Sequence, residues 1–308
     1  MEGDESDFYG DEDETRRLEG RVKGFDAAKW WQDPILPRGA FIKTQPTGDP
    51  SKGTVAKNSD FVNPFEGVSY AWQTHETIDA FLKRLPPSTT QVSPLVPWLY
   101  VCNPRSNFTT HKTSWQYQPS GGNEDEGPEM EGADLQRAQE GALVRLQAFH
   151  DTMKNVDSER KPQPFKTRLS NFERSEAVNN ILQLSHSCQV RSGKWMLFAE
   201  SESIDKFWKI IAQATIDDAL GVAAKVQLSP ESDPVQGRTE RLICIYTRNF
   251  FDQEDVERVL AKLRELKVTP MKPIYYKPDI FTYLGIVPGN KYGIKASMYS
   301  SKDFLSTK

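Results

Sequence analysis

Apolar residues in the last third of the chain follow two different spacings. Residues 203–220 and the stretch after Asp252 repeat apolar side chains every three or four positions, the period of an amphipathic helix. Short apolar runs lie between and around these stretches, at residues 194–198, 223–228, 241–247 and 272–276. Runs of this length are typical of buried strands. We therefore predict strands that alternate with helices in this part of the chain.

The middle of the chain shows the same two spacings with longer polar interruptions. The hydroxyl of Thr74 can cap a predicted helix, and a strand is predicted at 97–102. A second helix is predicted at 134–153. Residues 154–170 are basic and contain prolines, which favours a connecting segment. A short helix capped by Ser175 is predicted to follow.

These elements favour an α+β fold. A hairpin predicted across residues 229–240 joins two strands directly, which indicates antiparallel neighbours. We expect one curved, mostly antiparallel sheet with helices on its convex face. The predicted division is a disordered acidic tail at 1–18, an extended arm at 19–65, one α+β domain at 66–300 and a tail at 301–308. A disordered acidic insertion is predicted within the domain at about 105–132.

The predicted arm contains two adjacent tryptophans, Trp30 and Trp31, just before an Asp-Pro pair. Two exposed indole rings are costly in water, so we expect the arm to dock. It can dock onto the chain's own domain or onto a protein partner, and the sequence leaves both open.

Charge is unevenly distributed along the 308 residues, whose net charge is −4. Residues 1–15 carry eight acids and no base, and residues 121–140 carry seven acids and one base. The rest of the chain then holds 38 of the 39 basic residues and 28 of the 43 acidic ones. An excess of positive charge permits binding to phosphates, RNA or an acidic partner. The alternative is that the acidic runs only solubilise the protein.

Other features of the sequence limit the cellular compartments in which we expect the protein. No apolar run approaches 18 residues, so we expect no membrane contact by a spanning helix. An acidic start without a basic and apolar leader argues against secretion. The three cysteines, Cys102, Cys188 and Cys244, are far apart and odd in number, which fits a reducing environment. We predict the cytoplasm, with the nucleus as the alternative.

Motifs for catalysis, cofactors and metals are mostly missing. Residues 48–54 resemble a phosphate loop only loosely, because the Gly-Lys-Ser/Thr order is absent. His75-Glu76 lacks the second histidine of a zinc helix, and there is no C-x-x-C. Residues 186–188 read His-Ser-Cys, but a helix points them in different directions. We therefore expect no catalytic group, metal or cofactor; an enzyme has the least support.

Several continuous motifs carry a family resemblance. One is Ser192-Gly193-Lys194-Trp195, followed by Asp205-Lys206-Phe207-Trp208; another is the run from Tyr276 through Lys277, Pro278, Asp279 and Tyr283 to Ile286. With residues 78–88 and 97–101, these stretches closely resemble the basophilic-leukaemia-expressed protein family, whose domain has no assigned function. The resemblance covers roughly residues 65–300. It implies the fold of the cap-binding translation initiation factor 4E, in which helices back a bent antiparallel sheet and the concave side holds the cap.

Cap binding in that fold implies a specific set of side chains. Two indole rings sandwich a cationic methylated guanine, a carboxylate accepts from its edge, and Lys and Arg hold the triphosphate. By element order, Trp72 lies near one sandwich position and Trp115 is the nearest candidate for the other. Tyr246 falls where the family of cap binders has a third tryptophan. Basic candidates near the corresponding strands are Lys225, Arg238 and Arg241.

This chain departs from the cap-binding pattern at several points. No Trp-Glu pair occurs before Ser192, so the carboxylate has no candidate. Leu82 stands where the helix that takes a scaffold-protein peptide has a tryptophan. Trp72 is a candidate for either core or pocket, and Tyr246 for either the pocket or the concave surface in general. Residues 277–283 are a ligand-facing loop or a hydrogen-bonded structural turn.

Two functions from different classes follow. The first is a non-catalytic binding module for RNA or a nucleotide on the concave face of the sheet. The second is a protein-interaction adaptor that kept the fold but lost cap binding, with a partner held by Trp30, Trp31 and the convex helices. In either case we expect a monomer.

Overall fold

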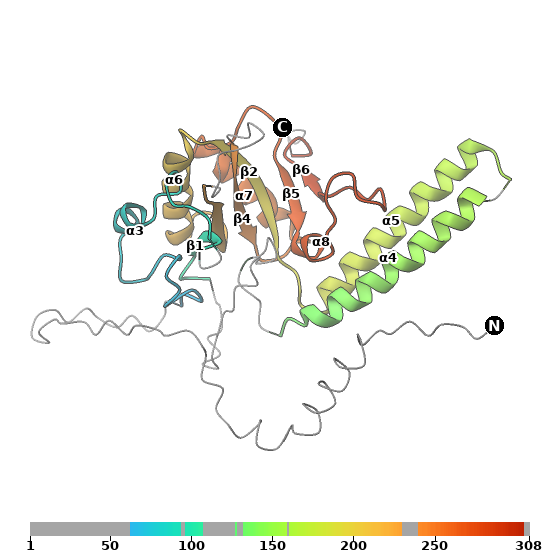
Figure 1. Cartoon of the computed structure of the whole chain (residues 1–308), viewed down its shortest axis with the longest axis horizontal. Helices are drawn as coiled ribbons and strands as arrows, with labels where there is room; N and C mark the ends of the chain where they lie inside the picture. The colour runs from blue at the N-terminus through green and yellow to red at the C-terminus, as the bar shows by residue number, and fades with distance from the viewer. Residues whose placement is uncertain are drawn as a thin grey trace, which may run out of the picture. The chain divides into compact units, whose positions relative to one another are not determined.

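The computed structural model describes residues 62–93, 96–106, 127, 132–158, 160–229 and 240–304 (Figure 1). All of them belong to one compact unit, Asn58–Lys308. Trp30, Trp31, Trp115 and Arg238 lie outside the described residues, as do the predicted tail at 1–18 and most of the predicted insertion. The predictions about them stay predictions.

A single antiparallel sheet of six strands forms the centre of this unit. The strands are β1 (Trp98–Cys102), β2 (Gly193–Glu200), β3 (Ala223–Gln227), β4 (Glu240–Thr247), β5 (Tyr275–Pro278) and β6 (Tyr299–Ser300). They lie in the order β1-β3-β4-β2-β5-β6. The predicted α+β class with a curved antiparallel sheet is confirmed.

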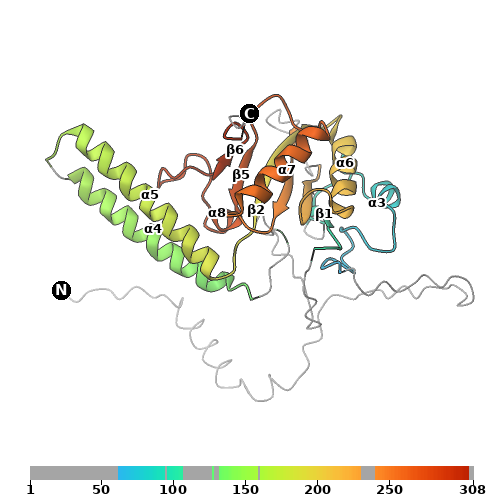
Figure 2. The same cartoon turned by 180° about the vertical axis from the view of Figure 1, so that it is seen from behind.

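Two helices cover one face of the sheet, as Figure 2 shows from the helix side. They are α6 (Ile204–Ile216), which contacts β1, β2 and β3, and α7 (Gln253–Glu265), which contacts β4. The indole nitrogen of Trp195 donates to the carbonyl of Val256 at 2.9 Å, which ties β2 to α7. Trp195 and Trp208 are both fully buried, as expected for core residues. Apolar burial on this face is the main stabilising contribution to the fold.

The short helix α3 (Ile78–Arg84) packs against α6. Its cap is Thr77, whose side chain accepts from the backbone N–H of Ala80 at 3.2 Å. The prediction of Thr74 as the cap was wrong because Thr74 lies one turn too early. Its hydroxyl donates instead to Glu66.

Two long helices form a hairpin, α4 (Leu135–Ser158) and α5 (Gln163–Ser187), that extends away from the sheet in Figure 1. The predicted connection at 154–170 is thus mostly helical. Pro164 lies in the first turn of α5, where proline costs no helical hydrogen bond. Ser175 is inside α5, and its hydroxyl donates to the carbonyl of Asn171. No helix in the described part of the chain is both long and apolar enough to cross a membrane.

The strand predicted at 272–276 is displaced toward the C-terminus. Pairing with β2 places β5 at Tyr275–Pro278, because Gly193–Met196 supply its partners. The helix α8 (Asp279–Tyr283) begins at once after β5. Backbone pairing therefore overrides the apolar run that suggested an earlier strand.

Substituting Gly193 with alanine is expected to destabilise the fold. A Cβ at this position would lie 2.5 Å from the hydroxyl oxygen of Tyr276, which is buried and shares a 2.6 Å hydrogen bond with Thr247. Because the ring cannot move without breaking that bond, overpacking should cost about 1–3 kcal/mol. Urea denaturation of Gly193→Ala checks this, with Ala80→Ser, a change of similar size at an exposed position of α3, as a control. Equal stability of Gly193→Ala and the wild type would contradict the packing described.

Candidate functional site

The face of the sheet opposite α6 and α7 combines aromatic, apolar and basic side chains. The register aligns Lys277, Lys194 and Tyr246 in one row across β5, β2 and β4. The next row holds Tyr275, Met196, Cys244, Lys225 and Tyr100, and the third holds Phe198, Leu242, Gln227 and Trp98. Three lysines thus lie on three strands of one face.

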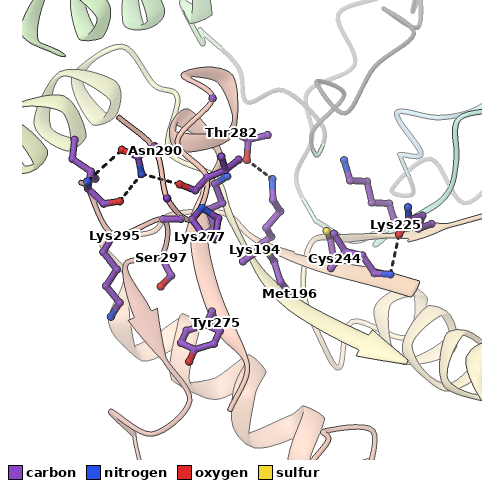
Figure 3. Close-up of a pocket in the computed structure, with 18 of the residues that line it drawn as sticks. Lys194, Met196, Lys225, Cys244, Tyr275, Lys277, Thr282, Asn290, Lys295 and Ser297 are labelled. Atoms are coloured by element: carbon purple, nitrogen blue, oxygen red, sulfur yellow. Dashed lines mark hydrogen bonds between the residues drawn. The ribbon is translucent and has the colours of Figure 1, made fainter. Parts of the chain in front are cut away.

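A pocket of about 920 Å³ opens on this face (Figure 3). Its floor is formed by the second and third rows, including Trp98, Met196, Leu242 and Cys244. A wall is formed by the segment that follows α8, with Val287, Pro288 and Ile294 among its apolar contributions. A pocket of this size, with an apolar floor and a few polar groups, suits a small ligand.

Four lysines line the pocket: Lys194, Lys225, Lys277 and Lys295. The first three are 3%, 2% and 7% exposed, and Lys295 is exposed. The described lining contains no Asp or Glu. Lysine is rarely buried to this extent, so three such residues on one sheet face are an unusual feature of this pocket.

Lys194 is held by a buried network at the start of β2. Its Nζ lies 3.1 Å from Oδ1 of Asp279 and donates to the hydroxyl of Thr282 at 3.0 Å. Ser192 donates its hydroxyl to the other carboxylate oxygen of Asp279 at 2.5 Å. Figure 3 shows Lys194 reaching from its strand to Thr282. The network joins β2 to the first turn of α8.

Lys225 is held differently, against aromatic rings. Its Nζ lies 4.4 Å from the ring centroid of Trp98 and 5.9 Å from that of Tyr246. The Nζ of Lys194 is 5.6 Å from the Tyr246 centroid. Ammonium groups at these distances are attracted to the electron-rich ring faces.

Hydrogen bonds from Asn290 stabilise the conformation of the segment that follows α8. The backbone N–H of Asn290 donates to Val287 at 3.1 Å across Pro288 and Gly289, and Gly289 has φ +78°. This is the geometry of a type II turn, which needs glycine at its third position. The side-chain nitrogen of Asn290 donates to the carbonyls of Val287 and Ile294 at 2.8 and 2.7 Å. The wall of the pocket is therefore preformed.

The helical hairpin contacts this same segment. The rings of His150 on α4 and Tyr292 meet edge to face, with centroids 6.2 Å apart. Gly293 lies close to the guanidinium of Arg174 on α5. A Cβ added to Gly293 would be 3.4 Å from a terminal guanidinium nitrogen of Arg174. The hairpin thus supports the pocket wall from outside.

Trp72 lies in the hydrophobic core and does not line the pocket. Its indole nitrogen donates to the carbonyl of Glu76 at 3.0 Å, and its backbone N–H donates to Tyr100. Of the two alternatives left by the sequence, this is the core position.

Tyr246 and Arg241 are likewise outside the pocket lining. Tyr246 is on the concave side but fully buried. Gly127 lies against its ring, because a Cβ added to Gly127 would be 2.8 Å from a ring carbon of Tyr246. Arg241 is also in β4, but its side chain points to the other face of the sheet from that of Tyr246. Its guanidinium donates to the carbonyls of Pro87 and Ser88 and to the hydroxyl of Ser229. Desolvation lowers the pKa of Arg241, and Asp205 acts against this shift.

Residues of the predicted motif loop divide between structure and pocket. Lys277 lines the pocket, whereas Asp279 is fully buried in the Lys194 network. Tyr276 faces the helix side, where burial raises the pKa of its phenol well above the ordinary value. Pro278 precedes α8, and the carbonyl of Tyr283 accepts from Gln139 on α4 at 3.4 Å. The segment is therefore mainly a hydrogen-bonded turn, with Lys277 and Thr282 in the pocket lining.

The pocket residues that sequence analysis did not name as site candidates include Trp98, Lys194 and Tyr275. The signal was present, because Lys194 and Lys225 interrupt otherwise apolar strands with one cation each. Strand alternation places each lysine on the face opposite the core helices. Among the described residues no three His, Cys, Asp or Glu side chains are grouped as metal ligands would be.

Comparison with protein families identifies the class of this chain. A family model described as basophilic leukemia-expressed protein Bles03 matches residues 18–285. The chain therefore belongs to the Bles03 family, and the predicted resemblance is confirmed.

Solved structures of translation initiation factor 4E also match part of the chain. One is Ascaris suum eIF4E-3 with an m2,2,7G cap, with 14% identity, a TM-score of 0.27, and coverage of 37% of this chain and 59% of that one. Another is the same protein with an m7G cap, with 15% identity, a TM-score of 0.27, and coverage of 39% and 59%. The matches thus span little more than half of those structures.

Proposed function

We propose that this chain is a non-catalytic binding module whose concave pocket holds a nucleotide, free or as the 5′ end of an RNA. The observation that carries the proposal is the convergence of Lys194, Lys225 and Lys277 on one pocket. Phosphate groups are bound by lysine as a compact point charge. Asp279 offsets the charge of Lys194, and Lys225, Lys277 and Lys295 are the other cations that line the pocket.

A base can find an apolar surface beside these lysines. Tyr275 lies next to Lys277's row and its side chain is 44% exposed, so a ring face is open to stacking. Met196 and Leu242 extend the apolar floor. Stacking of a base on an aromatic side chain contributes about 1–3 kcal/mol. The pocket therefore combines an anion-binding part with a surface for a flat ring.

Lys277→Ala is expected to weaken GTP binding about 10-fold, because it removes one charge-assisted contact from phosphate. Isothermal titration calorimetry of wild type and variant at two salt concentrations measures this. The wild-type affinity should fall as salt rises, since screening weakens charge attraction. A matched control is Lys206→Ala on α6, which removes an exposed lysine from the helix side.

Three outcomes separate the possibilities. GTP binding that Lys277→Ala weakens and Lys206→Ala does not supports the proposal. Equal losses in both variants, or no GTP binding at millimolar concentration, would reject it. A 5′-triphosphorylated oligoribonucleotide that binds at least 10-fold more tightly than GTP would identify the RNA end as the ligand.

An adaptor function is the second candidate, and the helical hairpin favours it. Leu143, Val144, Phe165 and Phe172 are exposed on α4 and α5. Exposed apolar side chains of this size on a projecting element are typical of protein contacts. Absence of nucleotide binding in the calorimetric experiment would leave this candidate as the better one.

A further inference from the structure

Aromatic rings on the pocket face already make cation–π contacts with lysine side chains of the protein itself. The Nζ of Lys225 lies over Trp98 at 4.4 Å and also approaches Tyr246 at 5.9 Å. Lys194 approaches Tyr246 from the neighbouring strand at 5.6 Å. Trp98 is 6% exposed, so little of its ring remains accessible beside Lys225.

A methylated guanine binds to aromatic ring faces of the kind that these lysines occupy. It carries a positive charge and is held in an aromatic sandwich by stacking and cation–π attraction. Here the ammonium of Lys225 takes the place of that charge on Trp98. A second cation brought to this ring would meet Lys225 at close range, and like charges repel.

The rest of the lining reinforces this preference. A cationic base would be surrounded by Lys194, Lys225, Lys277 and Lys295, and no carboxylate is among the described lining residues. Asp279, the carboxylate paired with Lys194, has its two oxygens engaged by Lys194 and Ser192. A neutral base avoids the repulsion and still gains from stacking on Tyr275.

We infer that the pocket selects nucleotides with a neutral base and that Lys225 acts against a 7-methylated, cationic guanine. This inference rests on the proposed function, since it names the ligand class of the same pocket. Lys225 thus has two roles: it attracts phosphate, and it closes the Trp98 ring to a cation.

The test compares the affinities of GTP and 7-methyl-GTP by isothermal titration calorimetry. In the wild type, 7-methyl-GTP should bind at least 3-fold more weakly than GTP. In Lys225→Ala the Trp98 ring is opened and a charge is lost, so the ratio should shift by at least 5-fold toward the methylated form. Lys295→Ala removes the same charge from the rim and keeps the Lys225–Trp98 contact, so its ratio should stay near that of the wild type.

Each result has a distinct meaning. Tighter binding of 7-methyl-GTP by the wild type would overturn the inference and leave the proposed function intact. An equal shift of the ratio in Lys225→Ala and Lys295→Ala would also overturn it, because charge alone would then explain the effect. Absence of binding by both nucleotides would reject the proposed function and the inference with it. Circular dichroism of Lys225→Ala checks that the variant remains folded.

Discussion

Asp279→Asn should lower the free energy of unfolding by about 3–5 kcal/mol. The carboxylate of Asp279 is fully buried, 3.1 Å from the ammonium of Lys194, which is itself 3% exposed. Removing the negative charge leaves the ammonium of Lys194 without the counter-charge of Asp279. Urea denaturation followed by circular dichroism gives the change.

A surface ion pair provides the matched control for this variant. Asp79 and Lys209 also form an ion pair, but their side chains are 77% and 54% exposed. Asp79→Asn should therefore change stability by less than about 1 kcal/mol. The double variant Lys194→Met/Asp279→Leu should be less destabilised than Asp279→Asn, because it removes both charges. Equal losses in Asp279→Asn and Asp79→Asn would contradict the role given to the buried pair.

The double variant Lys277→Ala/Lys295→Ala is expected to bind GTP about 100-fold more weakly than the wild type. Each lysine should contribute about 10-fold, and independent contributions multiply. Lys225 and the Lys194–Asp279 pair remain, so the pocket keeps the elements that shape it. Calorimetry at low salt measures the change.

Two further measurements make this prediction specific. The salt dependence of binding should be weaker in the double variant, because fewer charges attract the phosphates. The pair Lys206→Ala/Lys262→Ala, on α6 and α7, removes the same charge from the helix side. A loss of similar size in that pair would mean that overall charge, and not the pocket, governs binding.

The sequence predicted the fold to the extent that local spacing determines it. Short apolar runs located β2 and β4, and the period of 3.6 located α6 and α7, whose apolar sides form the core. The patterns failed where a long-range contact decides the structure. The position of β5 depends on pairing with β2, and α5 begins earlier because Pro164 fits a first helical turn.

The candidate site was less predictable than the fold. Lys225 and Lys277 were named from the sequence and both line the pocket. Trp72 and Tyr246 were placed by analogy of element order, and both rings are buried outside the lining. A single sequence does not reveal that Trp98 and Lys225 meet, since more than a hundred residues separate them and only strand pairing brings them together. Binding roles for Trp115, Arg238, Trp30 and Trp31 stay predictions.

A crystal structure of the protein with bound GTP would test the central claim most directly. We predict electron density for the phosphates within hydrogen-bonding distance of the Nζ atoms of Lys225 and Lys277, with the base against Tyr275. Density for GTP on another surface, or an empty concave pocket at saturating GTP, would contradict the claim.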